Sequence, residues 1–261
     1  MKTWVVITDL TRMQGTRVCL AGYTADKTCI RPVFRKPKGL TEEWLQATRH
    51  GIIRPFAVVE FDLLQAVPEP PHTEDWVISP VYRVKRVLEP AGQRALLEEI
   101  VDDSIGSIIG VPIQEEQQTF YIMAGEGARS LGTIRPREIT SVIYQGGLPD
   151  KRRYRIAFTD AEGESYRLAV TDLAFRYYLD DITTTKRLSP QKAAAQLMNL
   201  LNDTEVFLRV GLTRGWEKHP DRCYLQITGV HTFPDYLEGR CYSDFPQAHH
   251  PDLSEDEPIP F

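Results

Sequence analysis

Arginine and aromatic residues recur on one side of four strand-like segments in the second half of the chain. Successive side chains on a strand point to opposite faces, so the apolar residues of 153–159 share one face, and Arg153 and Arg155 share the other. Arg167 falls opposite the apolar residues of 165–171 in the same way. Two later segments leave four more residues on the outer face: Phe207 and Arg209 on the first, and Arg222 and Tyr224 on the second.

This outer face would suit single-stranded nucleic acid. Guanidinium groups bind phosphates through paired hydrogen bonds, and aromatic rings stack on bases. Stacking contributes about 1–3 kcal/mol per base and tolerates any sequence. Arg214 and Trp216, in the loop before the last segment, would extend the surface. The alternative interpretation is an ordinary solvent-facing sheet in which glutamates partner the arginines.

The register of two of these strands sharpens the hypothesis. If residues 161–163 form a three-residue turn, Arg155 lies directly across from Arg167. Like charges directly opposite one another destabilise a sheet unless an anion or an acid lies between them. The pair therefore indicates a position on this sheet that could hold a phosphate.

A second, smaller surface is predicted from basic residues outside these strands. Residues 125–132 contain glycines, a serine and an arginine that could wrap a phosphate, but they lack the lysine and the spacing of a P-loop, which favours a tight turn. The residues of this secondary surface are Arg12, Arg17, Tyr23, Arg31 and Arg129.

The elements that must position these residues occur in the same order twice. Three strands, one short helix and two further strands are the order of the OB-fold, a five-stranded Greek-key barrel that usually binds oligonucleotides or oligosaccharides. The first copy has predicted strands at residues 4–10, 17–24, 29–34, 56–64 and 81–88 and a helix at 41–49. The second has predicted strands at residues 139–144, 153–159, 165–171, 205–211 and 223–230 and a helix at 190–202. We therefore predict a mostly β fold of two OB-like five-stranded Greek-key β-barrels packed together, each with a short helix between strands 3 and 4.

The two barrels are expected to form one rigid body. A connecting helix is predicted at residues 92–103, and no Gly/Ser-rich or Pro-rich spacer divides the halves. Residues 1–103 would form the first barrel with this helix, and residues 104–243 the second. Residues 244–261, rich in proline, acids and histidine, are predicted to be an acidic flexible tail.

Charge is unevenly distributed along the chain. It contains 31 Lys and Arg against 36 Asp and Glu, a net charge of −5. Residues 244–261 hold five of the acids and no Lys or Arg, so the remainder is neutral. Residues 1–38 carry eight basic and two acidic residues, and residues 129–155 carry seven and two. Clustered positive charge on a neutral body is what a phosphate-binding groove needs.

The motifs of other functional classes are missing from the sequence. The four cysteines have no CxxC spacing, so we expect reduced thiols and neither a metal nor a cofactor. No GxSxG, HExxH or Cys/His signature occurs, which predicts a protein that is not an enzyme. No uncharged apolar run is long enough for a bilayer span or a signal peptide, so we expect a cytoplasmic protein with no membrane partner.

Several segments together resemble those of one protein family. They are ITDLTRM near the start, RPFAVVEFDLL, RSLGTIRP, and LTRGW followed by RCYLQITGVHTFPDYLEG near the end. The chain is similar, from about residue 2 to residue 238, to a family of prokaryotic dual OB-containing domain proteins. The resemblance implies two fused OB barrels and a nucleic-acid-binding role beside genome-defence or DNA-processing partners. It carries over no catalytic or binding residues.

We therefore expect a nucleic-acid-binding adaptor for single-stranded DNA or RNA. One alternative is a protein-interaction scaffold whose acidic tail mimics nucleic acid and engages a protein partner. A second alternative is a sensor of a small ligand or nucleotide, bound between the barrels.

Overall fold

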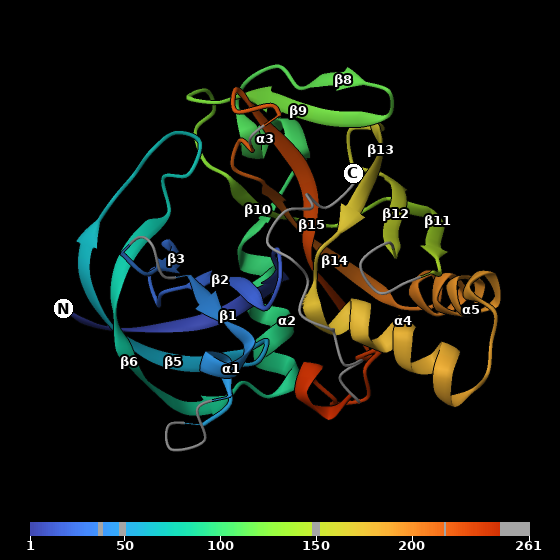
Figure 1. Cartoon of the computed structure of the whole chain (residues 1–261), viewed down its shortest axis with the longest axis horizontal. Helices are drawn as coiled ribbons and strands as arrows, with labels where there is room; N and C mark the ends of the chain where they lie inside the picture. Colours follow the sequence, from blue (N-terminus) through green and yellow to red (C-terminus); the bar gives the residue numbers. More distant parts are fainter. Residues whose placement is uncertain (36–38, 47–50, 148–151, 217, 246–261) are drawn as a thin grey trace.

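Two β-sheets lie side by side in the molecule. The computed structural model describes residues 1–35, 39–46, 51–147, 152–216 and 218–245. One sheet has six strands and the other nine. Figure 1 shows the first sheet on the left and the second on the right, with the helices α4 (Leu173–Thr185) and α5 (Pro190–Asn202) beside the second.

The first sheet is a closed five-stranded barrel with the strand order of an OB-fold. Strands β1, β5, β6, β3 and β2 pair in that order, and β1 also pairs with β2, which closes the barrel. The β3–β6 pair is parallel, whereas the other pairs are antiparallel. The elements are β1 (Lys2–Arg12), β2 (Arg17–Tyr23), β3 (Cys29–Val33), β4 (Leu40–Thr41), α1 (Glu42–Leu45), β5 (Ala57–Ala66) and β6 (Asp75–Val87).

The interior of this barrel is apolar, and α1 closes one end of it. Val5, Ile7 and Phe61 point inward from alternating positions and are fully buried. Thr41 caps α1, because its side chain accepts a hydrogen bond from the Trp44 amide at 3.3 Å. The cap is at the predicted residue. The predicted helix continues to residue 49, but α1 ends at Leu45, and residues 47–50 lie outside the described residues.

The second sheet repeats the OB strand order without the same closure. Strands β11, β12, β13, β15 and β14 pair in sequence, with β13 and β15 parallel. Strand β14 then pairs with β10, and α5 packs against β11 and β14. The elements are β7 (Val101–Asp102), α3 (Ile105–Ile109), β8 (Gln114–Glu116), β9 (Thr119–Met123), β10 (Leu131–Ile134), β11 (Glu138–Gln145), β12 (Arg153–Thr159), β13 (Ser165–Val170), β14 (Glu205–Leu212) and β15 (Arg222–Phe233).

The predicted mostly β, two-unit OB architecture is confirmed, but the second unit has two helices between its third and fourth strands instead of one. The additional helix is α4, which Asp172 caps: its side chain accepts a hydrogen bond from the Phe175 amide at 3.1 Å. Tyr, Phe and Thr are frequent in this segment and favour strands, which hides the helix from a sequence pattern. Leu173, Phe175 and Leu179 are fully buried and hold it in place.

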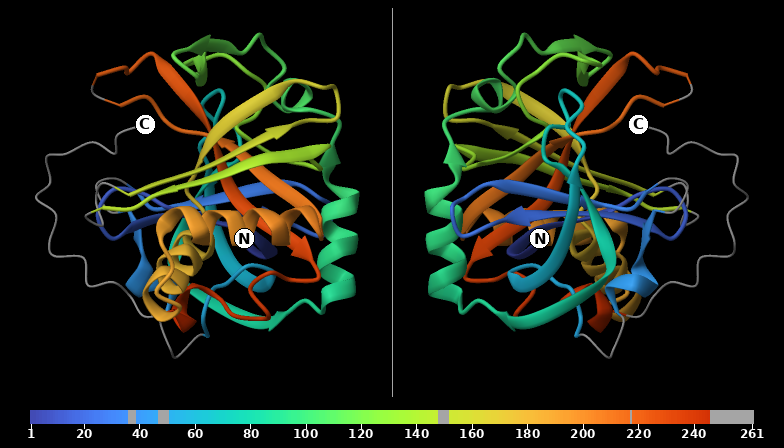
Figure 2. Two further views of the ribbon diagram at one scale, coloured as in Figure 1. Left: turned by 90° about the vertical axis from the view of Figure 1, so that its right-hand side faces the viewer. Right: turned by 90° about the vertical axis from the view of Figure 1, so that its left-hand side faces the viewer.

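Helix α2 (Pro90–Glu99) spans the two units. It corresponds to the helix predicted at residues 92–103 and stands along one side of the molecule in Figure 2. Leu97 packs in a small apolar cluster with Tyr23 and Phe56 from the first unit and Phe207 from the second. The helix therefore packs against both units.

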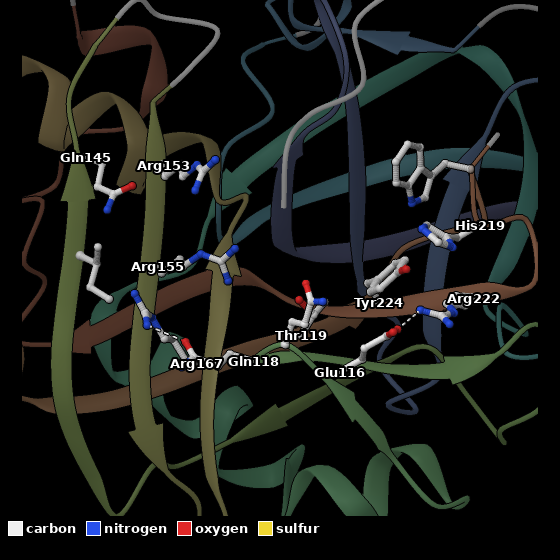
Figure 3. A pocket seen from close by; sticks show the side chains of 13 residues that line it. Glu116, Gln118, Thr119, Gln145, Arg153, Arg155, Arg167, His219, Arg222 and Tyr224 are labelled. Carbon is white, nitrogen blue, oxygen red and sulfur yellow. Dashed lines mark hydrogen bonds and ion pairs between the residues drawn. The ribbon is translucent and has the colours of Figure 1, made fainter.

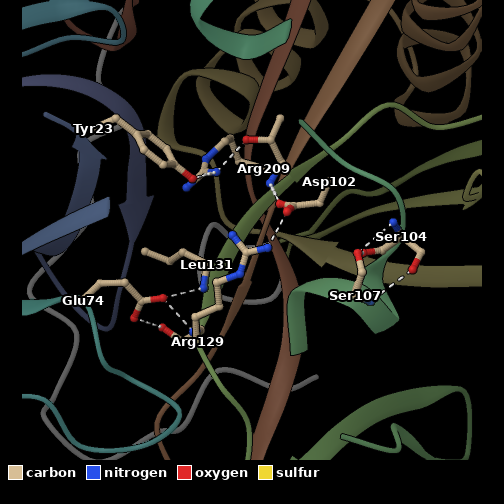
Figure 4. Close-up of polar contacts among 10 residues, drawn as sticks. Tyr23, Glu74, Asp102, Ser104, Ser107, Arg129, Leu131 and Arg209 are labelled. Atoms are coloured by element: carbon tan, nitrogen blue, oxygen red, sulfur yellow. Dashed lines mark hydrogen bonds and ion pairs between the residues drawn. The ribbon is translucent and has the colours of Figure 1, made fainter. Parts of the chain in front are cut away.

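A buried ion pair lies at the junction of the two units. Arg209, on β14, is fully buried, and its Nε donates to Asp9 Oδ2 of β1 at 2.9 Å. Its Nη1 donates to the Tyr23 hydroxyl at 2.9 Å and to Thr133 Oγ1 at 2.7 Å. Burial would lower the pKa of Arg209, but the Asp9 carboxylate beside it raises the pKa above its ordinary value. Figure 4 shows Arg209 reaching Tyr23, with a second group of polar contacts around Glu74 and Arg129 nearby.

Two β-bulges position Thr8 and Thr228, the other two hydrogen-bond donors to Asp9. The β1–β2 register shifts between Ile7 and Asp9, and the β14–β15 register shifts between Arg209 and Val210, which leaves Thr228 as the extra residue on β15. A bulge re-aims a side chain that regular alternation would send to the other face. Thr8 Oγ1 and Thr228 Oγ1 accordingly both donate to Asp9, at 2.7 and 2.5 Å.

His231, at the same junction, gives the fold a pH dependence. Its Nε2 donates to the Thr8 carbonyl at 2.9 Å, and burial lowers its pKa to about 4 from an ordinary 6.5. Between about pH 4 and pH 6.5, His231 is protonated in the unfolded chain but neutral in the folded protein. The free energy of unfolding therefore falls as the pH drops through this window, by up to about 1.4 kcal/mol per pH unit from this group.

We expect His231→Gln to reduce that pH dependence, because glutamine can still donate to the Thr8 carbonyl but does not titrate. Urea unfolding between pH 7.5 and pH 4.5 measures it. The substitution should bring the slope of unfolding free energy against pH closer to zero. Parallel curves for the two proteins would contradict a buried neutral histidine.

The predicted tail begins inside the folded part of the chain. Phe245 is buried, with its ring centroid 6.3 Å from that of Tyr178 on α4. A short 3-10 helix, Tyr242–Asp244, leads into it. The rest of the predicted acidic tail, residues 246–261, lies outside the described residues.

Candidate nucleic-acid interface

A groove of about 560 Å³ lies on the second unit, over the face formed by its second and third OB strands, β12 and β13. The β8–β9 hairpin and the loop joining β14 to β15 border it. Strands 2 and 3, with the loop between strands 4 and 5, are where OB-folds bind their ligands. Six of the nine residues predicted for the main surface line the groove: Arg153, Arg155, Arg167, Trp216, Arg222 and Tyr224.

Three arginines occupy one half of the groove, which we call the cationic half: Arg153, Arg155 and Arg167. Tyr154 and Ile156 point into the core, so the predicted alternation on β12 is confirmed and both arginines of that strand face out. Figure 3 shows these three side chains on one side of the groove and His219, Arg222 and Tyr224 on the other.

The predicted register of these strands is wrong by one pair. Arg155 lies opposite Ala169, and Arg167 lies opposite Ala157, so the two arginines are diagonal neighbours. Diagonal side chains on a sheet are still within reach of each other when they are long. Burial, followed by the charges of Arg167 and Arg153, lowers the pKa of Arg155.

The cationic half is not neutralised by acids within the described part of the chain. No ion pair joins an Asp or Glu among those residues to any of its three arginines. Arg167 Nη1 donates to Gln118 Oε1 at 2.8 Å, while its Nε is buried and has no acceptor among the described residues. The glutamate partners of the alternative interpretation are therefore not found among these contacts.

The other half of the groove, which we call the aromatic half, contains Trp216, His219, Arg222 and Tyr224. The ring centroid of His219 is 5.6 Å from that of Trp216 and 6.3 Å from that of Tyr224. Arg222 forms an ion pair with Glu116 of β8, and its guanidinium carbon lies 4.4 Å from the Tyr121 ring centroid. Tyr224 is only 5 % exposed, so Trp216 and His219, both half-buried, offer more ring surface to a ligand.

Two predicted surface residues are buried at the junction instead. Phe207 and Arg209 are both fully buried, because β14 is covered on both faces: one by the core of the second unit and one by the first barrel and α2. The prediction that they face solvent is wrong. Alternation along a strand indicates an exposed face only where nothing packs on it.

Arg214 also lies outside the groove lining. It forms an ion pair with Asp75 of β6, and its Nη1 is 3.9 Å from Glu69 Oε2. The neighbouring Thr213 accepts a hydrogen bond from the Tyr224 amide at 2.9 Å. Arg214 thus attaches the loop that borders the aromatic half to the first barrel.

The secondary surface does not form as one face. Arg12, Tyr23 and Arg31 are buried, and Arg12 and Arg31 form ion pairs with Glu42 and Asp75. The remaining two members, Arg17 and Arg129, bond to Gln14 and Asp102. Arg12 and Arg31 thus serve internal contacts, whereas Arg17 is exposed on β2.

Sequence reasoning missed the β8–β9 hairpin, which brings Glu116, Gln118 and Thr119 into the groove. Its turn residues, Gln117 and Gln118, have φ values of 51° and 64°. Two-residue hairpin turns usually contain Asn-Gly or Asp-Gly, which makes them recognisable in a sequence. Because Gln-Gln is not such a signal, only the apolar run at residues 120–123 could have indicated a strand.

Comparison with known proteins agrees with this geometry. A family model described as the dual OB-containing domain matches residues 2–230. The chain belongs to the dual OB-containing domain family. The match covers nearly all of both units and includes the residues that line the groove. No curated protein matches the sequence. Among the described helices, the longest apolar stretch falls short of what a membrane crossing requires.

Proposed function

We propose that this dual OB-containing protein binds single-stranded DNA or RNA in the groove of its second unit, as an adaptor and not as a catalyst. The observation that carries the proposal is the cationic half: three arginines on the OB ligand face with no acidic partner among the described residues. Desolvating like charges together is costly unless an anion binds them. A phosphate backbone supplies such anions at regular intervals.

The aromatic half supports a single strand over a duplex. Rings at the groove wall can stack only on bases that are free of a complementary strand. Trp216 and His219 lie on the same loop, across the groove from the arginines. A strand lying in the groove would place phosphates at the arginines and bases at these rings.

Fluorescence anisotropy with a labelled oligonucleotide of mixed sequence tests the proposal. Single-stranded DNA, single-stranded RNA and duplex DNA are titrated at 50 and 200 mM salt. We expect single strands to bind more tightly than the duplex, with affinity falling as salt rises, because each neutralised phosphate contributes about 0.7 to the slope for a single strand. Absence of binding at low salt would overturn the proposed function.

A substitution of Arg214 separates loop positioning from phosphate contact. Arg214→Ala should weaken binding by about threefold to tenfold, since the loop loses its attachment to Asp75. The slope of log affinity against log salt should stay unchanged, because this guanidinium holds an acid and not a phosphate. Arg155→Ala is the matched comparison and should lower the slope by about 0.7. An equal loss of slope in both variants would show that Arg214 contacts phosphate.

A further inference from the structure

The charge in the groove exceeds what one backbone phosphate can balance. Among the described residues that line the groove, four are arginines and one is an acid, Glu116, which is paired with Arg222. The three arginines of the cationic half therefore have no acidic partner within that part of the chain. A phosphodiester inside a strand carries one negative charge.

The three arginines are close to one another. Arg153 and Arg155 are two positions apart on one strand face, and Arg167 is the diagonal neighbour of Arg155. Burial is the largest cause that lowers the pKa of Arg155, and the charges of Arg167 and Arg153 lower it further. Figure 3 shows all three side chains in the same half of the groove, on two neighbouring strands.

Arg167 is held in position and still lacks an acceptor. Gln118, at the turn of the β8–β9 hairpin, binds Nη1, which fixes the direction of the guanidinium. The Nε of Arg167 is buried without an acceptor among the described residues. A guanidinium carries five N–H donors, so the bond to Gln118 leaves donors from which a ligand oxygen could accept.

We propose that the cationic half binds the terminal phosphomonoester of a nucleic acid strand in preference to a phosphodiester within it. A phosphomonoester carries a charge of about −1.5 to −2 at neutral pH and three acceptor oxygens, which suits three guanidinium groups better than one phosphodiester does. The inference rests on the proposed function and specifies it further: the protein recognises the end of a strand.

The aromatic half fits this arrangement. The groove volume of about 560 Å³ is the size of a small-molecule site and not of a long channel. With a terminal phosphate at Arg155 and Arg167, the first bases of the strand would extend toward Trp216 and His219. A free nucleotide shares the phosphomonoester chemistry, so the test must distinguish it from a strand end.

Three versions of one short single-stranded oligonucleotide make the test: a 5′-phosphate, a 3′-phosphate and no terminal phosphate. We expect one of the two phosphorylated ends to bind about tenfold more tightly than the unphosphorylated strand, equivalent to at least one added charge-assisted hydrogen bond. Equal affinities for all three would overturn the inference while leaving the proposed function intact. If none of the three oligonucleotides binds, the proposed function itself would be overturned.

A competition experiment and two variants complete the test. A nucleoside monophosphate should displace the phosphorylated oligonucleotide only at concentrations far above those of the oligonucleotide; equal potency would assign the groove to free nucleotides and overturn strand-end recognition. Arg167→Gln should bring the ratio of affinities for phosphorylated and unphosphorylated strands close to one. Arg137→Gln, at an exposed arginine outside the groove lining, should keep the ratio of the unaltered protein. A ratio unchanged in Arg167→Gln would overturn the assignment.

Discussion

Replacing Arg155 and Arg167 together with glutamate is expected to abolish binding of single-stranded nucleic acid at near-physiological salt. Each substitution removes a phosphate contact and places a negative charge where the backbone would lie. Loss of two charge-assisted contacts, at about 1.5–3 kcal/mol each, corresponds to a weakening of at least 100-fold before repulsion is added. The residual salt slope should fall by about 1.4, since each lost phosphate contact removes about 0.7.

The control for this reversal is Arg137→Glu. Arg137 is exposed and precedes β11 of the same sheet, yet it does not line the groove. It should bind as the unaltered protein does, and thermal unfolding should show that both proteins remain folded. Binding that survives the double reversal with its salt slope intact would place the nucleic-acid site elsewhere on the molecule.

Asp9→Ala is expected to destabilise the protein by about 3–5 kcal/mol, the usual cost of removing one partner from a buried ion pair. Arg209 is fully buried and would keep its charge without the carboxylate. The hydroxyls of Thr8 and Thr228 would lose their acceptor at the same time. Equilibrium unfolding in urea measures the loss. Asp62→Ala, which removes an exposed partner of the N-terminal amine, should cost less than about 1 kcal/mol.

The double variant Asp9→Leu, Arg209→Met tests whether the penalty comes from the unpaired charge. Apolar residues of similar volume can replace a buried ion pair at little cost, so the double variant should be more stable than Asp9→Ala. Unfolding of the unaltered protein should also be a single transition by fluorescence and by circular dichroism, because the buried junction joins the two units. If the double variant Asp9→Leu, Arg209→Met is instead less stable than Asp9→Ala, the result would contradict the role assigned to the ion pair.

The fold was largely predictable because its signals are local. Strand alternation gave the inward faces of β12 and β13, where Tyr154, Ile156 and Leu168 are buried as expected. Thr41 and Ser189 marked the starts of α1 and α5 through ordinary capping chemistry. The order of these elements was then enough to predict two OB-like units, since few topologies accommodate it.

The candidate groove was predicted only in part. Arg153, Arg155 and Arg167 lie on a face that solvent reaches, so alternation was sufficient to find them. Glu116 and Gln118 come from a hairpin whose Gln-Gln turn carries no recognisable signal. Their contribution depends on a register that no single segment encodes.

By itself, the sequence determined most of the strands and helices, though not α4 or the β8–β9 hairpin, and which side of each predicted OB strand is apolar. Tertiary structure alone decided whether the polar side of a strand meets water or another sheet. Arg155 and Arg209 illustrate the difference, because both are arginines between apolar neighbours on OB strands, yet one lines a groove and the other is fully buried against Asp9. The physical reason is that strand periodicity reports the environment of one face only, whereas burial of the second face depends on a contact between residues 200 positions apart.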